Sequence, residues 1–105
     1  MIRRVSRDCL GPIDLRPDAV IAKPPSYFAG RFGYKFCRDQ DDLDEYEAAF
    51  FLLDDAIPLA LIRYRGNPPD QVTLYLDNSG PSADETRARI LDQLGIAAAS
   101  VAWHT

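Results

Sequence analysis

Four cations and one tyrosine are the residues whose types and spacing could bind a ligand. Arg31 and Lys35 lie four residues apart in one aromatic-rich segment, and Arg63 and Arg65 flank Tyr64 in a second segment. Alternate residues of a strand point to the same face, so two neighbouring strands could gather these cations into one basic patch. Guanidinium and ammonium groups bind phosphates and carboxylates. The sequence therefore predicts a ligand-binding site at these five residues, although they could instead form the solvated rim of an oligomer interface.

No metal site and no cofactor are expected. The acidic run at residues 39–47 invites comparison with a calcium-binding EF-hand loop, which needs an acidic or amide residue at position 5, glycine at position 6 and glutamate at position 12. Counting from Asp39, these positions hold Leu43, Asp44 and Phe50. The run is therefore interpreted as a solvated acidic loop. No phosphate-binding loop, dinucleotide-binding glycine pattern or zinc-protease motif occurs in the sequence.

The sequence gives little support for catalysis, and no catalytic residue is assigned. His104 is the only histidine. A nucleophile pair of Cys37, or of a serine, with His104 is an open alternative, but no G-x-S-x-G elbow supports it. Cys37 is expected to be a small core residue. Two cysteines are too few for a disulfide-stapled scaffold.

Composition indicates one globular, acidic domain with an uneven charge. The 105 residues are 47% hydrophobic and 27% charged, with a net charge of −4. Residues 1–38 hold eight Lys and Arg against three Asp and Glu, and residues 39–105 hold four against thirteen. The basic segment could lie on the acidic remainder or present a basic binding face. The acidic total argues against a nucleic-acid partner, which usually needs a basic face.

Two further observations concern partners and location. Residues 30–36, GRFGYKF, resemble the aromatic and basic strand of RNA-recognition domains, but the first Gly and Arg are exchanged and no helix is expected between the first two strands. A core strand with outward cations is the preferred interpretation.

No apolar run approaches the roughly 20 residues that span a membrane, and no secretory signal follows the basic N-terminus. A cytoplasmic location without a membrane partner is expected.

Hydrophobic periodicity predicts the order of the elements. Residues 1–26, interrupted by four prolines, are expected to form an irregular arm. Residues 27–77 are expected to form an antiparallel meander that begins with a strand over 27–38, because aromatic residues alternate there with cations. The region 43–53 fits a helix or a strand, and the strand is preferred because a tight turn at Asp54 and Asp55 and a second apolar run follow it.

A helix is predicted over 82–94, followed by a final strand over 100–104. Ser82 and Glu85 have capping-box spacing, and Gly95 suits the left-handed position that ends a helix, with Ile96 available for the accompanying apolar contact. The predicted fold is α+β: a single domain with a four- to five-stranded, largely antiparallel sheet and one C-terminal helix on one face. The strand order cannot be derived from the pattern.

The central strands are apolar on both faces, although one helix covers only one face. The second face must then be covered by the N-terminal arm or by another subunit, and a homodimer through this face is predicted. Absent catalytic motifs favour a non-catalytic, self-associating module that binds a partner protein or a small anionic ligand. The alternative is a small enzyme with a pocket between helix and sheet, near Tyr34, Tyr64 and His104.

Overall fold

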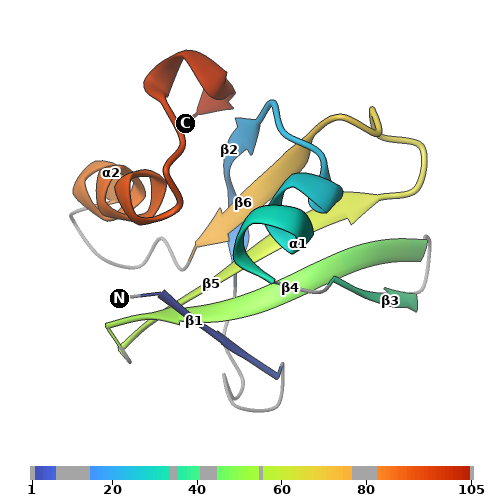
Figure 1. The fold of residues 1–105 in the computed structure, drawn as a ribbon, viewed down its shortest axis with the longest axis horizontal. Coiled ribbons are helices and arrows are strands. Elements are labelled where there is room, and N and C mark those ends of the chain that lie inside the picture. Colours follow the sequence, from blue (N-terminus) through green and yellow to red (C-terminus); the bar gives the residue numbers. More distant parts are fainter. Residues whose placement is uncertain are drawn as a thin grey trace.

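A seven-stranded, largely antiparallel sheet and two helices form the described part of the chain (Figure 1). The computed structural model describes residues 2–6, 15–33, 36–40, 45–54, 56–76 and 83–104, with the side chains of 83, 98 and 104 left out. The strands are β1 (Ile2–Val5), β2 (Arg16–Ile21), β3 (Cys37–Gln40), β4 (Glu45–Leu53), β5 (Ile57–Tyr64), β6 (Val72–Leu76) and β7 (Val101–His104); the helices are α1 (Pro25–Phe32) and α2 (Ala83–Gln93), and a short 3-10 helix spans Ala98–Ser100. The predicted α+β class with a largely antiparallel sheet is confirmed, but the sheet has more strands and the described residues include a second helix.

The predicted meander is present in the middle of the sheet. β4 pairs with β5 from Tyr46↔Tyr64 to Leu53↔Ile57, and β5 pairs with β6, so the strand interpretation of residues 48–53 is correct. Three residues join β4 to β5, and the Ala56 N–H donates to the Leu53 carbonyl at 3.1 Å. Asp54 in this turn has a φ of 54°. This left-handed conformation is tolerated by aspartate better than by most residues, which explains how an Asp-Asp turn serves in a hairpin.

The strand order is β1-β4-β5-β6-β2-β7, and β3 pairs with β4 beside β1. β1 lies opposite residues 50–53 of β4 and β3 lies opposite residues 45–48, so both short strands share one edge of β4. β2 lies between β6 and β7 at the other side of the sheet. Segments distant in sequence therefore extend the meander on both sides.

The expected irregular arm over 1–26 is wrong for the described residues, because they contain β1 and β2. Proline at 17 is compatible with β2 because the pairing with β6 shifts register between Pro17 and Ala19. At such a bulge one residue, here Asp18, has no partner across the ladder. A proline in a sheet is tolerated at a bulge of this kind.

The expected strand over 27–38 is also wrong: residues 25–32 form α1, and of the described residues in this range only Cys37 and Arg38 belong to a strand, β3. Pro25 occupies the first turn of α1, and Gly33 ends it with a φ of 73° and an N–H that donates to the Ala29 carbonyl at 3.0 Å. Proline inside the start and glycine just past the end are typical of a helix. The alternation of Phe28 and Phe32 was ambiguous, since residues four apart also share one helix face.

Both helices cover one face of the sheet and close the main core. Phe28 of α1 and Ile90 and Leu94 of α2 are at most 1% exposed. They pack in one cluster with alternate residues of four strands, namely Ala19, Ile21, Ala49, Phe51, Leu53, Leu59, Leu61, Val72, Leu74 and Leu76. This burial, at about 25 cal/mol per Å² of apolar surface, is the main force that holds the helices on the sheet.

α2 confirms the predicted C-terminal helix and its end. Gly95 has a φ of 67°. The N–H of Ile96 donates to the Leu91 carbonyl at 2.8 Å, and the N–H of Gly95 donates to the Asp92 carbonyl at 3.1 Å. These two bonds are the Schellman motif. The predicted capping box involves Ser82, which lies outside the described residues. The predicted final strand is β7.

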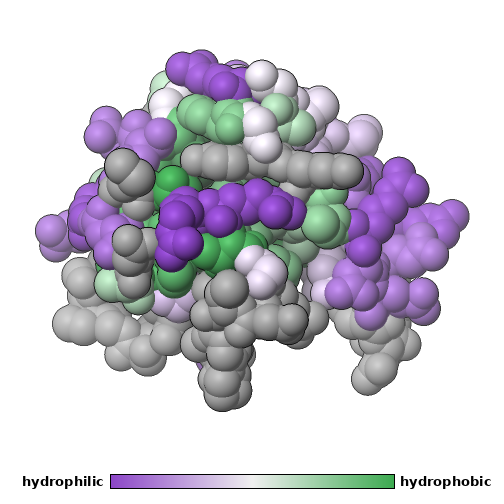
Figure 2. Space-filling model, turned by 60° about the horizontal axis from the view of Figure 1, so that its bottom comes forward, coloured by the Kyte–Doolittle hydropathy of each residue, from purple (hydrophilic) through white to green (hydrophobic). Residues whose placement is uncertain are grey.

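The second face of the sheet is buried within one chain at its centre. Four residues there are each at most 9% exposed: Tyr46, Ala48, Ala60 and Ile62. The partly buried side chains that pack against them are Leu15, Phe50, Tyr64 and Tyr75. Seen from the side at which β1 lies, hydrophobic surface is crossed by hydrophilic side chains (Figure 2). The uncovered face that motivated the predicted dimer is therefore not found among the described residues, and the N-terminal segment contributes Leu15 to its cover.

Candidate functional site

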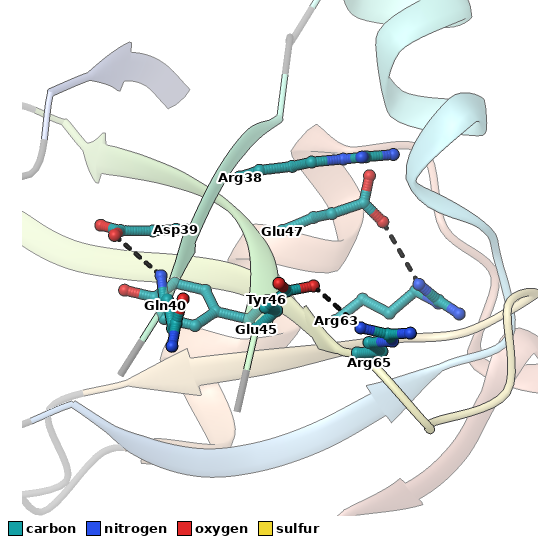
Figure 3. A pocket seen from close by; sticks show the side chains of 8 residues that line it. All are labelled: Arg38, Asp39, Gln40, Glu45, Tyr46, Glu47, Arg63 and Arg65. Atoms are coloured by element: carbon teal, nitrogen blue, oxygen red, sulfur yellow. Dashed lines mark hydrogen bonds and ion pairs between the residues drawn. The ribbon is translucent and has the colours of Figure 1, made fainter. Parts of the chain in front are cut away.

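A cleft of about 670 Å³ lies where β3, β4 and β5 end side by side (Figure 3). Its lining consists of three arginines, three carboxylates, one amide and one tyrosine: Arg38, Arg63, Arg65, Asp39, Glu45, Glu47, Gln40 and Tyr46. The formal charges of this lining cancel. Small-molecule pockets are mostly apolar, whereas six of the eight side chains that line this cleft are charged.

The register of the strands sets the charges in rows. Arg38 of β3 lies opposite Glu47 of β4, and Glu47 lies opposite Arg63 of β5. Residues opposite each other in an antiparallel ladder share a face, and the side chains of Arg38 and Glu47 extend side by side in Figure 3. The resulting row has the charge order plus, minus, plus. Gln40 opposite Glu45, with Arg65 bound to Glu45, makes a second row.

The guanidinium of Arg63 makes its hydrogen bonds within the chain. Its Nη1 donates to Glu47 Oε2 at 3.3 Å, its Nη2 to the Asn67 carbonyl at 3.2 Å and its Nε to the Pro68 carbonyl at 3.4 Å. All three nitrogens therefore have acceptors, two of them in the loop between β5 and β6. The side chain of Arg63 is 21% exposed, so this arginine fastens the loop to β4 and has little capacity for a ligand.

Arg65 and Arg38 are more accessible. The Arg65 side chain is 80% exposed and its partner Glu45 is 60% exposed, with 3.3 Å between Nη1 and Oε2. Exposed pairs of this kind contribute little and exchange readily with other partners. Arg38 is exposed, and no carboxylate of the described residues lies within ion-pair distance of it. These two guanidinium groups are therefore the cations of the cleft that an incoming anion can reach.

The structure brings together only part of the predicted site. Arg63 and Arg65 line the cleft, and Tyr64 does not. Tyr64 lies on the sheet face opposite Arg63, where its ring packs, with 5.3 Å between centroids, on that of Tyr46, which does border the cleft. Arg31 lies on α1, where its Nη1 donates to the Tyr27 hydroxyl at 2.9 Å, and it does not line the cleft. Lys35 lies outside the described residues. The four cations therefore do not form the single patch that alternation suggested.

Sequence reasoning missed Arg38, Gln40 and the two glutamates of the cleft. The signal that could have found them is the alternation of charge in Arg38 and Asp39, followed by Glu45 and Glu47, on either side of a short acidic loop. Such a loop can join a hairpin, and a hairpin would place opposite charges across from each other. The expectation of one long aromatic strand before the loop concealed this pairing.

The arrangement of the strands separates the residues of the catalytic alternative. Cys37 is exposed on β3, not in the core as expected, and its Sγ lies 3.2 Å from Arg4 Nη2. The backbone of His104 is in β7, at the opposite edge, with β4, β5, β6 and β2 between. Five strand spacings amount to roughly 24 Å in an untwisted sheet. Cys37 and His104 therefore cannot form a nucleophile pair within one chain.

The alternative pocket near Tyr34, Tyr64 and His104 also lacks support. Tyr64 packs on the sheet face opposite the helices, while Tyr34 and the His104 side chain lie outside the described parts. Within the described ranges, no three potential metal ligands of the His, Cys, Asp and Glu types cluster together. None of the described helices is long and apolar enough to cross a membrane.

Comparisons with protein-family models, with curated proteins and with solved structures give no match for this chain.

Proposed function

We propose that this protein is a non-catalytic binding module whose cleft holds an extended, acidic segment of a partner protein. The observation that carries the proposal is the pair of accessible arginines, Arg38 beside β4 on β3 and Arg65 at the end of β5, with the glutamates of β4 between them. A carboxylate of the partner would pair with Arg38, which has no carboxylate partner in the described part of the chain, and a second would compete with Glu45 for Arg65.

The alternation of charge in the cleft supports a protein segment over a small anion. A simple anion would meet the three carboxylates of the lining as well as its three arginines. An extended chain places side chains about 3.3 Å apart along its length, so acidic groups can reach the two arginines while backbone and polar groups pass the glutamates. Complementary charges of this type give specificity and a fast association rate more than affinity.

Fluorescence anisotropy with a labelled hexaglutamate peptide tests the proposal. We expect weak, saturable binding that falls as salt is raised, because exposed ion pairs are screened. Arg38→Glu and Arg65→Glu should each weaken binding by about tenfold, equivalent to about 1.4 kcal/mol. A hexalysine peptide of equal length should bind no better to the wild type than to these variants.

Arg31→Glu is the matched control, since it makes the same charge change on α1, outside the cleft. It should alter the affinity by less than about twofold. Equal losses in all three variants would indicate an effect of net charge and contradict a site in the cleft. Binding of inorganic phosphate or citrate without binding of the peptide would replace the protein segment by a small anion.

A further inference from the structure

The two outer edges of the sheet differ in charge. At one edge, β1 and β3 carry Arg3, Arg4, Arg38 and Asp39. At the other edge, β7 has the sequence VAWH and contains no Asp, Glu, Lys or Arg. Charged residues on an edge strand hinder its pairing with another strand. β7 therefore lacks the protection that the opposite edge has.

Trp103 is the exposed hydrophobic residue of this edge. It is 50% exposed, and no other large hydrophobic side chain within the described ranges is exposed. Trp103 lies opposite Val20 of β2, and Val20 lies opposite Thr73 of β6, so the tryptophan continues a row on the second face of the sheet. Tryptophan is enriched among the residues that dominate protein interfaces. Its position on an uncharged edge indicates an association surface.

We propose that β7 pairs antiparallel with β7 of a second copy of this chain, with the two Trp103 side chains packed against each other across a two-fold axis. Such an interface is self-complementary, because the same strand serves both partners. An uncharged strand creates no like-charge pair when it meets itself, whereas two copies of β1 would oppose the arginines Arg3 and Arg4. Cross-strand aromatic pairs also stabilise a ladder, by about 0.2–1 kcal/mol each. This interface replaces the second sheet face as the site of the predicted dimer.

The dimer should be weak. Only four residues of β7 are available, and the register against β2 shifts between Val20 and Ile21, which shortens the regular edge. An interface built on four residues of each copy is expected to bury less than the roughly 1,200 Å² that is typical of stable complexes. Association is therefore expected at tens to hundreds of micromolar, on the order of −5 to −6 kcal/mol.

The single tryptophan of the chain makes the interface directly observable. Sedimentation velocity from about 1 µM to about 1 mM, a range that spans the expected dissociation constant, should show the mass doubling. Over the same range the Trp103 emission should shift to shorter wavelength as its exposed half is buried. Trp103→Lys should remain a monomer throughout, because the two-fold axis would bring two ammonium groups together.

Gln40→Lys is the matched control, since it adds the same charge to the opposite edge strand and should dimerise like the wild type. Ala102→Lys is a second variant on β7, also at an exposed position, and covers the case in which Trp103→Lys fails to fold, as judged by circular dichroism. A wild type that stays monomeric at 1 mM overturns the proposal and leaves the edge for a strand of a different protein. A dimer that survives both β7 substitutions overturns it as well, because its interface must lie elsewhere.

Discussion

Asp18 is the residue whose environment departs most from what its type prefers. It lies at the bulge of β2 and is 0% exposed. Arg87 of α2 binds both of its carboxylate oxygens, with 2.6 Å from Nε to Oδ2 and 3.2 Å from Nη2 to Oδ1. The hydrogen bond to Asp18 raises the pKa of Arg87 above its usual value, against the opposing effect of burial. This pair fastens the helix to the sheet, and the guanidinium stays charged at any physiological pH.

Substitution of Asp18 should therefore lower the free energy of unfolding more than most single substitutions do. Asp18→Ala leaves the Arg87 charge, itself 8% exposed, without its main partner, and the expected loss in the free energy of unfolding is about 3–5 kcal/mol. Urea denaturation measures it. Asp84→Ala, which removes the 89% exposed second partner of Arg87, is the control and should cost about 0.5 kcal/mol or less. Similar losses in the two variants would show that the buried Arg87–Asp18 pair contributes no more to stability than the exposed Arg87–Asp84 pair.

At the scale of the elements, both helices end in a glycine with positive φ. Gly33 ends α1 and Gly95 ends α2. A Cβ on Gly95 would also lie 3.1 Å from Nη2 of Arg31, which reaches over from α1. The end of α2 thus forms part of the contact between the helices. Gly30, in contrast, is inside α1, and a Cβ there would meet nothing within 4 Å.

Two alanine substitutions should consequently have opposite signs. Gly95→Ala is expected to lower the free energy of unfolding by about 1–2 kcal/mol, since an L residue is strained in the left-handed region and Arg31 must move. Gly30→Ala should raise it by about 0.5–1 kcal/mol, because glycine is unfavourable inside a helix. Thermal unfolding of both variants measures the difference. A stabilised Gly95→Ala would refute the capping role.

In the molecule as a whole, the centre of the sheet is buried and its edge strand β3 is exposed. β5 lies between β4 and β6, with residues 59–62 buried. β3 lies at the edge and all four of its residues are exposed. Local opening needs little free energy where few apolar contacts are lost. The cleft is thus built from one rigid wall, β4 and β5, and one wall that opens easily.

Native-state hydrogen exchange should resolve this difference. We expect the amides of β5 to exchange only through global unfolding, at the same free energy as in urea denaturation. The amides of β3 should exchange through local opening, at least about 2 kcal/mol lower. Binding of the hexaglutamate peptide should slow exchange in β3, and it should slow exchange in β5 only by the factor by which it raises the free energy of global unfolding. Uniform protection across the sheet would contradict a separately opening edge.

The candidate site could be predicted only in part. Arg63 and Arg65 were found because their alternation with Tyr64 is local, and β5 is apolar enough to identify as a strand. Arg38 was missed because its partner Glu47 becomes a neighbour only when β3 pairs with β4. Arg31 was assigned to the patch because Phe28 and Phe32 fit both a strand and a helix.

The sequence by itself determined the β4–β5–β6 meander, α2 with its glycine end, and the final strand. These elements are specified locally, by apolar periodicity and turn residues. Only the tertiary structure decided that β1 and β2 are strands, that residues 25–32 form a helix, and that the centre of the second face is buried within one chain. The physical reason is that short segments gain their stability from partners far away in sequence, such as β1 from β4 and β2 from β6 and β7. Their own propensities are too weak to choose a structure before those partners meet them.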